Sequence, residues 1–187
     1  MKALLFDHSS PADVRLYADS AIGRPSMPLF VPDTFGPWSG KVCLAARVCR
    51  LGKCIAERFA LRYIDAVSAV HVMHSPAAGN LSYIADNAII QGEYVPLSDL
   101  GDTITLSVSR APLKGQEEPS ESARITVGTD RLGIARAISS LSALTTFKTG
   151  DIIIFPSPAV DTDPENNKNT YITATVNGRL CIKFKIK

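Results

Sequence analysis

The chain has 187 residues, 45% of them hydrophobic and 20% charged, a balance typical of a globular protein rather than a disordered one. Its 20 basic and 18 acidic residues leave a formal net charge of +2, which gives no reason to expect a nucleic acid or an anionic membrane as partner. No apolar run is long enough to cross a bilayer, and the run after Met1 is too short for a signal peptide. We therefore expect a cytoplasmic protein with a single domain over residues 1–187.

The first quarter of the chain has weak patterns. Residues 2–6 form a short apolar run that predicts an edge strand, and residues 12–21 predict a short helix with Pro11 near its first turn. Prolines bracket residues 27–31, which are strand-like. A turn rich in proline and glycine follows.

The next segment has the clearest organisation. Residues 41–48 alternate with the period of a strand that buries one face, and Leu51-Gly52-Lys53 interrupts them. Apolar residues then recur at helical spacing over residues 55–63, and residues 65–73 return to strand character. This stretch predicts a strand, a turn, a short helix and a second strand.

The remaining elements are mostly strands. We predict strands at residues 103–109 and 151–155, a helix at 130–144, and exposed loops at 111–122 and 156–169. Near the end, Asn177-Gly178 between two alternating runs predicts a β-hairpin with a type I′ turn. With strands outnumbering single interspersed helices, the fold class is a β-rich α+β domain.

The stretch RVCRLGKCIAERFALRYIDAV at residues 47–67 resembles a segment of the fumarylacetoacetate hydrolase family. Four further segments are similar to family motifs in the same order: MPLFVPDTFG, GEYVPLSDLGD, TFKTGDIIIFPSP and GRLCIKFKIK. Asp86 matches the aspartate of the family's KGFDGSAP-like motif. The likeness begins near Met27, so residues 1–26 are a poorly matched N-terminal segment. It implies a mixed-sheet β-roll with a few short helices, commonly assembled as a homodimer.

In the family, a Glu-x-Glu strand and an aspartate on a later strand hold Mg²⁺, Mn²⁺ or Ca²⁺. The metal chelates a diketo or acylpyruvate-like acid, which then undergoes carbon–carbon bond hydrolysis or decarboxylation. Counting from the matched segments places these three ligand positions on Lys41, Cys43 and Val72. A lysine has the wrong charge for a cation site, a lone thiolate suits a hard ion poorly, and valine has no ligand atom.

Other pocket positions also differ from the family. A family lysine falls on Tyr83, the small polar Thr-Gly-Thr motif begins at Phe155, and the N-terminal His-x-x-Glu lid has no counterpart. These differences predict no catalytic residues and no cofactor. The resulting hypothesis is a catalytically inactive family member with a binding or structural role, either as a homodimer or paired with an intact paralogue.

The alternative is an active hydrolase or lyase on diketo or acylpyruvate-like acids with a rebuilt site around Cys43 and His71, together with His74. A thiol beside an imidazole could act as a nucleophile or hold Zn²⁺. However, His71 and His74 are three residues apart on an expected strand and would point to opposite faces.

Two charged patterns have simpler explanations. The run Asp161-x-Asp163-x-Glu165 begins like a calcium-binding loop but lacks its glycine and its final glutamate, so an exposed polar loop is expected. The basic residues between Arg47 and Arg62 are interspersed with Glu57 and Asp65, which favours a solvated, ion-paired surface. The four cysteines form no CxxC pair, and we expect reduced thiols: Cys43, Cys49, Cys54 and Cys181.

Overall fold

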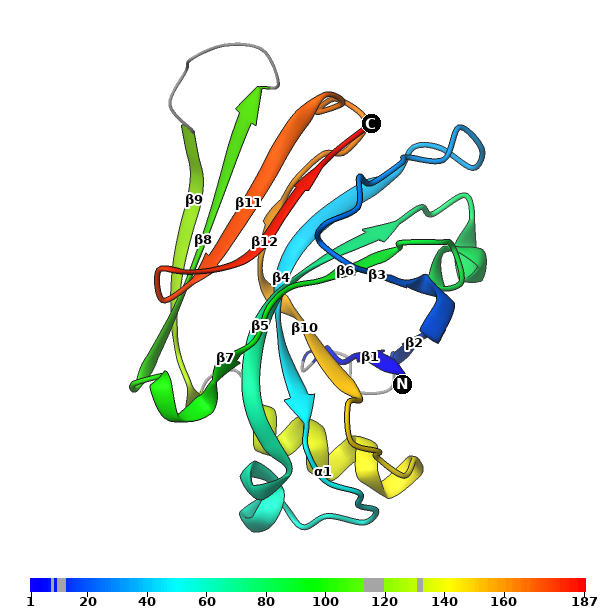
Figure 1. Cartoon of the computed structure of the whole chain (residues 1–187). Coiled ribbons are helices and arrows are strands. Elements are labelled where there is room, and N and C mark those ends of the chain that lie inside the picture. Colours follow the sequence, from blue (N-terminus) through cyan, green and yellow to red (C-terminus); the bar gives the residue numbers. More distant parts are fainter. Residues whose placement is uncertain (8, 10–12, 113–119, 131–132) are drawn as a thin grey trace.

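Two β-sheets and one α-helix make up most of the structure, a computed structural model that describes residues 1–7, 9, 13–112, 120–130 and 133–187 (Figure 1). The β-rich α+β class and the mixed-sheet roll predicted from the sequence are confirmed. Among the described residues, no helix combines the length and the hydropathy needed to cross a lipid bilayer.

The larger sheet has eight strands and is built on three long antiparallel neighbours, β10, β4 and β5. Two short strands are added in parallel, β1 beside β10 and β3 beside β6, so the sheet is mixed. The strand order is β2-β1-β10-β4-β5-β6-β3, with β7 also paired to β5. The strands are β1 (Ala3–Leu5), β2 (Arg15–Tyr17), β3 (Ile22–Gly23), β4 (Ser39–Val48), β5 (Ile64–His74), β6 (Ile89–Gln91), β7 (Val95–Pro96) and β10 (Ile152–Asp161).

The larger sheet curls into a nearly closed roll. Its two edge strands, β2 and β3, follow one another in the chain and are separated only by the 3-10 helix η1 (Asp19–Ala21) and Ala18. So short a link brings the two edges of the sheet toward each other. The roll therefore has an inner face, which it encloses, and an outer face.

The smaller sheet and the helix cover the outer face. The sheet has the order β12-β11-β8-β9, with strands β8 (Thr103–Pro112), β9 (Ser120–Gly128), β11 (Thr170–Val176) and β12 (Arg179–Lys185). The helix α1 (Ile134–Leu144) buries Ile134, Ala137, Ile138 and Leu141. It lies beside the 3-10 helix η2 (Glu57–Tyr63) at one end of the molecule (Figure 1).

Two hydrophobic cores follow from this arrangement. The outer core joins the outer face to the smaller sheet and α1, and includes Leu44, Val67, Ile138 and Phe155. The inner core fills the roll; its buried members are Ala3, Leu5, Tyr17, Ala21, Cys43, Ala45, Val70, Val72, Ala88, Ile89, Ile152 and Ile154. The central strands β4 and β5 are buried on both faces because they separate these cores.

The N-terminal expectations were wrong in two places. Residues 12–21 form no α-helix in their described part, because β2 and η1 occupy it. The strand at residues 2–6 is not at an edge, because β1 has β2 on one side and β10 on the other. The strand-like segment at 27–31 contributes a single bridge, Leu29 to Ile186, since its flanking prolines cannot donate hydrogen bonds to a ladder.

Candidate functional site

The three positions that match the family's metal ligands lie together on the inner face. In the antiparallel pairing of β4 with β5, Lys41 is opposite Val72 and Cys43 is opposite Val70. Residues directly opposite each other, and residues two apart on one strand, share a face. Lys41, Cys43 and Val72 therefore form one contiguous patch. The three side chains are close neighbours, but their residue types do not suit a hard metal ion.

This patch is closed except at Lys41. Cys43 has 1% and Val72 has 7% of its surface exposed, and both pack in the inner core. At Lys41 the patch is open to solvent: 53% of the side chain is exposed, and the ammonium lies 3.8 Å from the Asp161 carboxylate. An ammonium, a thiol and an aliphatic side chain thus occupy the three positions at which a metal site of this family would need carboxylates.

Burial also removes the reactivity of the thiol. Full burial raises the pKa of Cys43 to about 12, and the nearby Lys41 ammonium offsets only part of that rise. A thiol needs its thiolate form to attack an electrophile or to bind a metal. Cys43 is therefore a packing residue at neutral pH.

His71 lies on the outer face, across the sheet from Cys43. It is paired with Val42, and its imidazole Nε2 is 3.0 Å from the Thr162 hydroxyl. Its ring centroid lies 5.0 Å from that of Phe184 in the outer core. Burial lowers the pKa of His71 to about 3, so the ring is neutral at pH 7. Cys43 and His71 cannot act as a nucleophile and base pair, because the sheet separates them.

His74 is not brought to Cys43 either. Its ring stacks on Tyr83 with a centroid distance of 5.9 Å, and Tyr83 meets Tyr17 edge to face at 5.2 Å. Partial burial and the positive charge of Arg15 lower the pKa of His74. This aromatic stack closes part of the inner core.

The two remaining pocket positions, Tyr83 and Phe155, lie on different faces of the larger sheet. Tyr83 packs against the inner core, near the family-matched patch. Phe155 is paired with Leu44 and belongs to the outer core, so it does not fill the roll. Its side chain lies on the opposite face of the sheet from Cys43.

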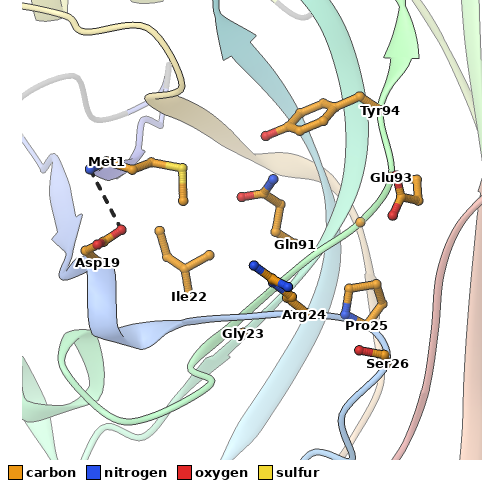
Figure 2. A pocket seen from close by; sticks show the side chains of 11 residues that line it. Met1, Asp19, Ile22, Gly23, Arg24, Pro25, Ser26, Gln91, Glu93 and Tyr94 are labelled. Carbon is orange, nitrogen blue, oxygen red and sulfur yellow. Dashed lines mark ion pairs between the residues drawn. The ribbon is translucent and has the colours of Figure 1, made fainter.

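Beside the inner core there is an open space, which the patch residues do not line. A cavity of about 630 Å³ lies between η1, β3 and the segment after β6 (Figure 2). Neither Lys41, Cys43 nor Val72 lines it. Its lining residues are Met1, Asp19, Ile22, Gly23, Arg24, Pro25, Ser26, Gln91, Gly92, Glu93 and Tyr94. Sequence reasoning missed this cavity, because most of its walls are brought together by the long-range parallel pairing of β3 with β6.

The charged patterns resolve into local pairs. Glu165 accepts a hydrogen bond from the Trp38 backbone N–H at 2.6 Å, and Asp163 accepts from the Asn166 amide at 2.8 Å. Arg47 forms two hydrogen bonds with Asp65, at 2.8 and 2.7 Å. Within the described ranges, no three His, Cys, Asp or Glu side chains gather as metal ligands.

No protein-family model and no curated protein sequence matches the chain. Solved structures do match. A protein assigned to the fumarylacetoacetate hydrolase family, from Yersinia pestis CO92, is 15% identical with a TM-score of 0.74 and covers 100% of this chain and 93% of its own. The chain has the fumarylacetoacetate hydrolase fold.

Two further neighbours of this fold carry ligands. Fumarylpyruvate hydrolase from Pseudomonas aeruginosa, in complex with Mn²⁺ and pyruvate, is 13% identical with a TM-score of 0.71, over 100% of this chain and 90% of its own. Maleylpyruvate hydrolase from Sphingobium sp. SYK-6, in complex with manganese(II) ion and pyruvate, is 16% identical with a TM-score of 0.73, over 98% of this chain and 70% of its own.

These complexes contradict the expectation of no cofactor, because proteins with the same fold hold Mn²⁺. The residues at the family-matched patch do not fit such an ion. An ammonium repels a cation, and the thiol of Cys43 is protonated and soft. A metal bound to this chain would need ligands other than Lys41, Cys43 and Val72.

Proposed function

We propose that this chain belongs to the fumarylacetoacetate hydrolase family, has lost the family's catalytic reaction, and acts as a homodimer in a binding or structural role. The observation that carries the proposal is the closed patch: Cys43 and Val72 are buried among aliphatic side chains where the reaction needs an accessible, charged site. A cytoplasmic location is part of the proposal and agrees with four free cysteines.

The proposed loss of catalysis has a steric cause as well as an electrostatic one. A substrate chelated at this patch would need room beside Cys43 and Val72, which the inner core fills. The buried thiol offers no nucleophile, and His71 is on the other face. The alternative of a rebuilt hydrolytic site around Cys43 and His71 therefore receives no support.

Two measurements test the proposal: an assay of substrate hydrolysis and the molecular mass of the protein in solution. The purified chain, supplied with Mn²⁺, is assayed for hydrolysis of fumarylpyruvate and maleylpyruvate, the substrates named for two neighbours of this fold. We expect no turnover. Light scattering after gel filtration should give the mass of two chains. A monomer, or a stoichiometric complex with an intact paralogue, would overturn the homodimer.

A further inference from the structure

We propose that a slot beside β12 binds the acidic C-terminal end of a partner protein. The slot belongs to the smaller sheet rather than to the roll, and it lies between residues 25–28 and β12, an edge strand of that sheet (Figure 1). Its volume is about 400 Å³. Its walls contain no aspartate or glutamate but three lysines, Lys183, Lys185 and Lys187.

The edge of β12 is covered on both sides of Lys183 but open beside it. The Cys181 carbonyl accepts a hydrogen bond from the Glu93 N–H at 2.8 Å, and the Lys185 carbonyl accepts one from the Leu29 N–H at 2.8 Å. Main-chain groups of successive residues point to alternate sides of a strand, so the N–H and C=O of Lys183 face this edge too. Neither group has a hydrogen-bond partner in the described part of the chain. The Glu93 side chain lines the other cavity (Figure 2) and not this slot.

The slot is short, and it fits the end of a chain. The hydrogen bonds at Cys181 and Lys185 close it at both ends, so a continuous strand could not pass along this edge. A terminal residue could enter it: its N–H would donate to the Lys183 carbonyl, and its carboxylate would accept from the Lys183 N–H. An apolar side chain on that residue would contact Met27 and Pro28.

The lysine side chains set the charge of the partner. Lys183, Lys185 and Lys187 alternate with Phe184 and Ile186, which are buried. The three lysines therefore share the solvent-facing side of the smaller sheet, with neighbours about 7 Å apart along the chain. Among the described residues, none of them forms an ion pair. Acidic residues just before the terminus would pair with the lysines that the terminal carboxylate does not reach.

Two aromatic rings position the outer lysines. The Lys183 Nζ atom lies 5.8 Å from the centre of the Tyr171 ring, and the Lys187 Nζ atom lies 5.4 Å from that of Phe30. Such contacts restrict the ammonium groups and lower the entropy cost of pairing them with an acid. The ammonium groups also leave less ring surface for stacking with nucleobases. The arrangement therefore favours an acidic peptide over a single-stranded nucleic acid.

The test is fluorescence anisotropy with the full chain and a labelled peptide, GEVEV, that has a free carboxyl end. Two further peptides each lack one feature: amidated GEVEV lacks the terminal charge, and GQVQV lacks the acidic side chains. We expect GEVEV to bind at least about tenfold more tightly than its amide, because a charge-assisted hydrogen bond is worth at least that factor. It should bind about threefold more tightly than GQVQV, since the ion pairs of its side chains would be exposed. Absence of GEVEV binding, equal binding of its amide, or tighter binding of a single-stranded oligothymidylate would overturn the proposal.

Variants locate the site. The double variant Lys183→Gln/Lys185→Gln should weaken GEVEV binding at least about threefold. The matched variant Lys53→Gln removes an exposed lysine near η2 and should leave binding unchanged. None of these three side chains is buried, so folding should be unaffected. Undiminished binding in the double variant would place the peptide elsewhere and contradict the assignment. None of these results depends on whether the chain turns over an acylpyruvate.

Discussion

Cys43 and His71 lie on adjacent paired strands but on opposite faces of one sheet. Cys43 packs inside the roll, whereas His71 faces the smaller sheet and contacts Thr162 and Phe184. Their separation is set by the period of two in a β-strand, so no rotation of side chains brings them together. The thiol and the imidazole that suggested chemistry in the sequence are two independent packing residues.

The pH dependence of stability should report the burial of His71. Its pKa is about 3 in the folded chain and near 6.5 when unfolded, so the unfolded state binds more protons between these values. Stability is therefore complete above pH 6.5 and falls as the pH drops, by up to about 1.4 kcal/mol per pH unit. Urea denaturation from pH 7 to 5 measures this. His71→Leu should flatten the slope, whereas the matched variant His74→Gln should change it less. An unchanged slope in His71→Leu would contradict the account.

Thiol accessibility should separate the cysteines. Cys54 is exposed and should react at once with Ellman's reagent, whereas Cys43 and Cys181 are buried and should react only in denaturant. The Cys54→Ser variant should lose the fast phase, and Cys43→Ser should keep it. Rapid labelling of Cys43 in the folded chain would show that the roll is open.

Gly40 should be intolerant of substitution, because a Cβ atom there would lie 2.5 Å from the Thr162 Oγ1 atom and 2.6 Å from the His71 Nε2 atom. Gly40→Ala must push these bonded side chains apart, and we expect a loss of roughly 1 to 3 kcal/mol in the free energy of unfolding. Gly101→Ala is the matched control, since nothing lies within 4 Å of its added Cβ. Equal denaturation midpoints for the two variants would contradict this packing.

The N-terminal segment should be anchored by Asp151. Its buried carboxylate accepts hydrogen bonds from the Lys2 backbone N–H at 3.0 Å, the Lys2 ammonium at 2.6 Å and the Lys148 N–H at 2.8 Å. Asp151→Ala leaves these donors unpaired and should cost about 3 kcal/mol. Asp13→Ala breaks an exposed pair with Arg15 and should cost less than about 1 kcal/mol. Thermal unfolding distinguishes the two, and similar losses would argue against the anchor.

Local signals in the sequence were sufficient for some elements. The Asn177-Gly178 turn was predicted because both residues tolerate positive φ, and they adopt φ values of 49° and 78° between β11 and β12. The helix at 130–144 was predicted from its apolar period and is confirmed over Ile134–Leu144. Such features depend on a few neighbouring residues.

Features that depend on distant pairing were missed. The three-residue strand β2 has no periodicity of its own and exists because β1 pairs with it. An exposed loop was predicted for residues 156–169, directly after the strand at 151–155. Instead, β10 continues to Asp161 through a register shift between Phe155 and Ala159. For the same reason the sequence did not reveal the cavity, most of whose walls are brought together by the pairing of β3 with β6.

The closed patch at Lys41, Cys43 and Val72 should support no acylpyruvate hydrolysis. The most direct measurement is pyruvate formation from fumarylpyruvate by the purified chain at high concentration with Mn²⁺ added, followed by NADH oxidation through lactate dehydrogenase. We predict a rate equal to that of Mn²⁺ alone. Pyruvate formation that rises with protein concentration, co-elutes with the chain and falls in Lys41→Ala would contradict it.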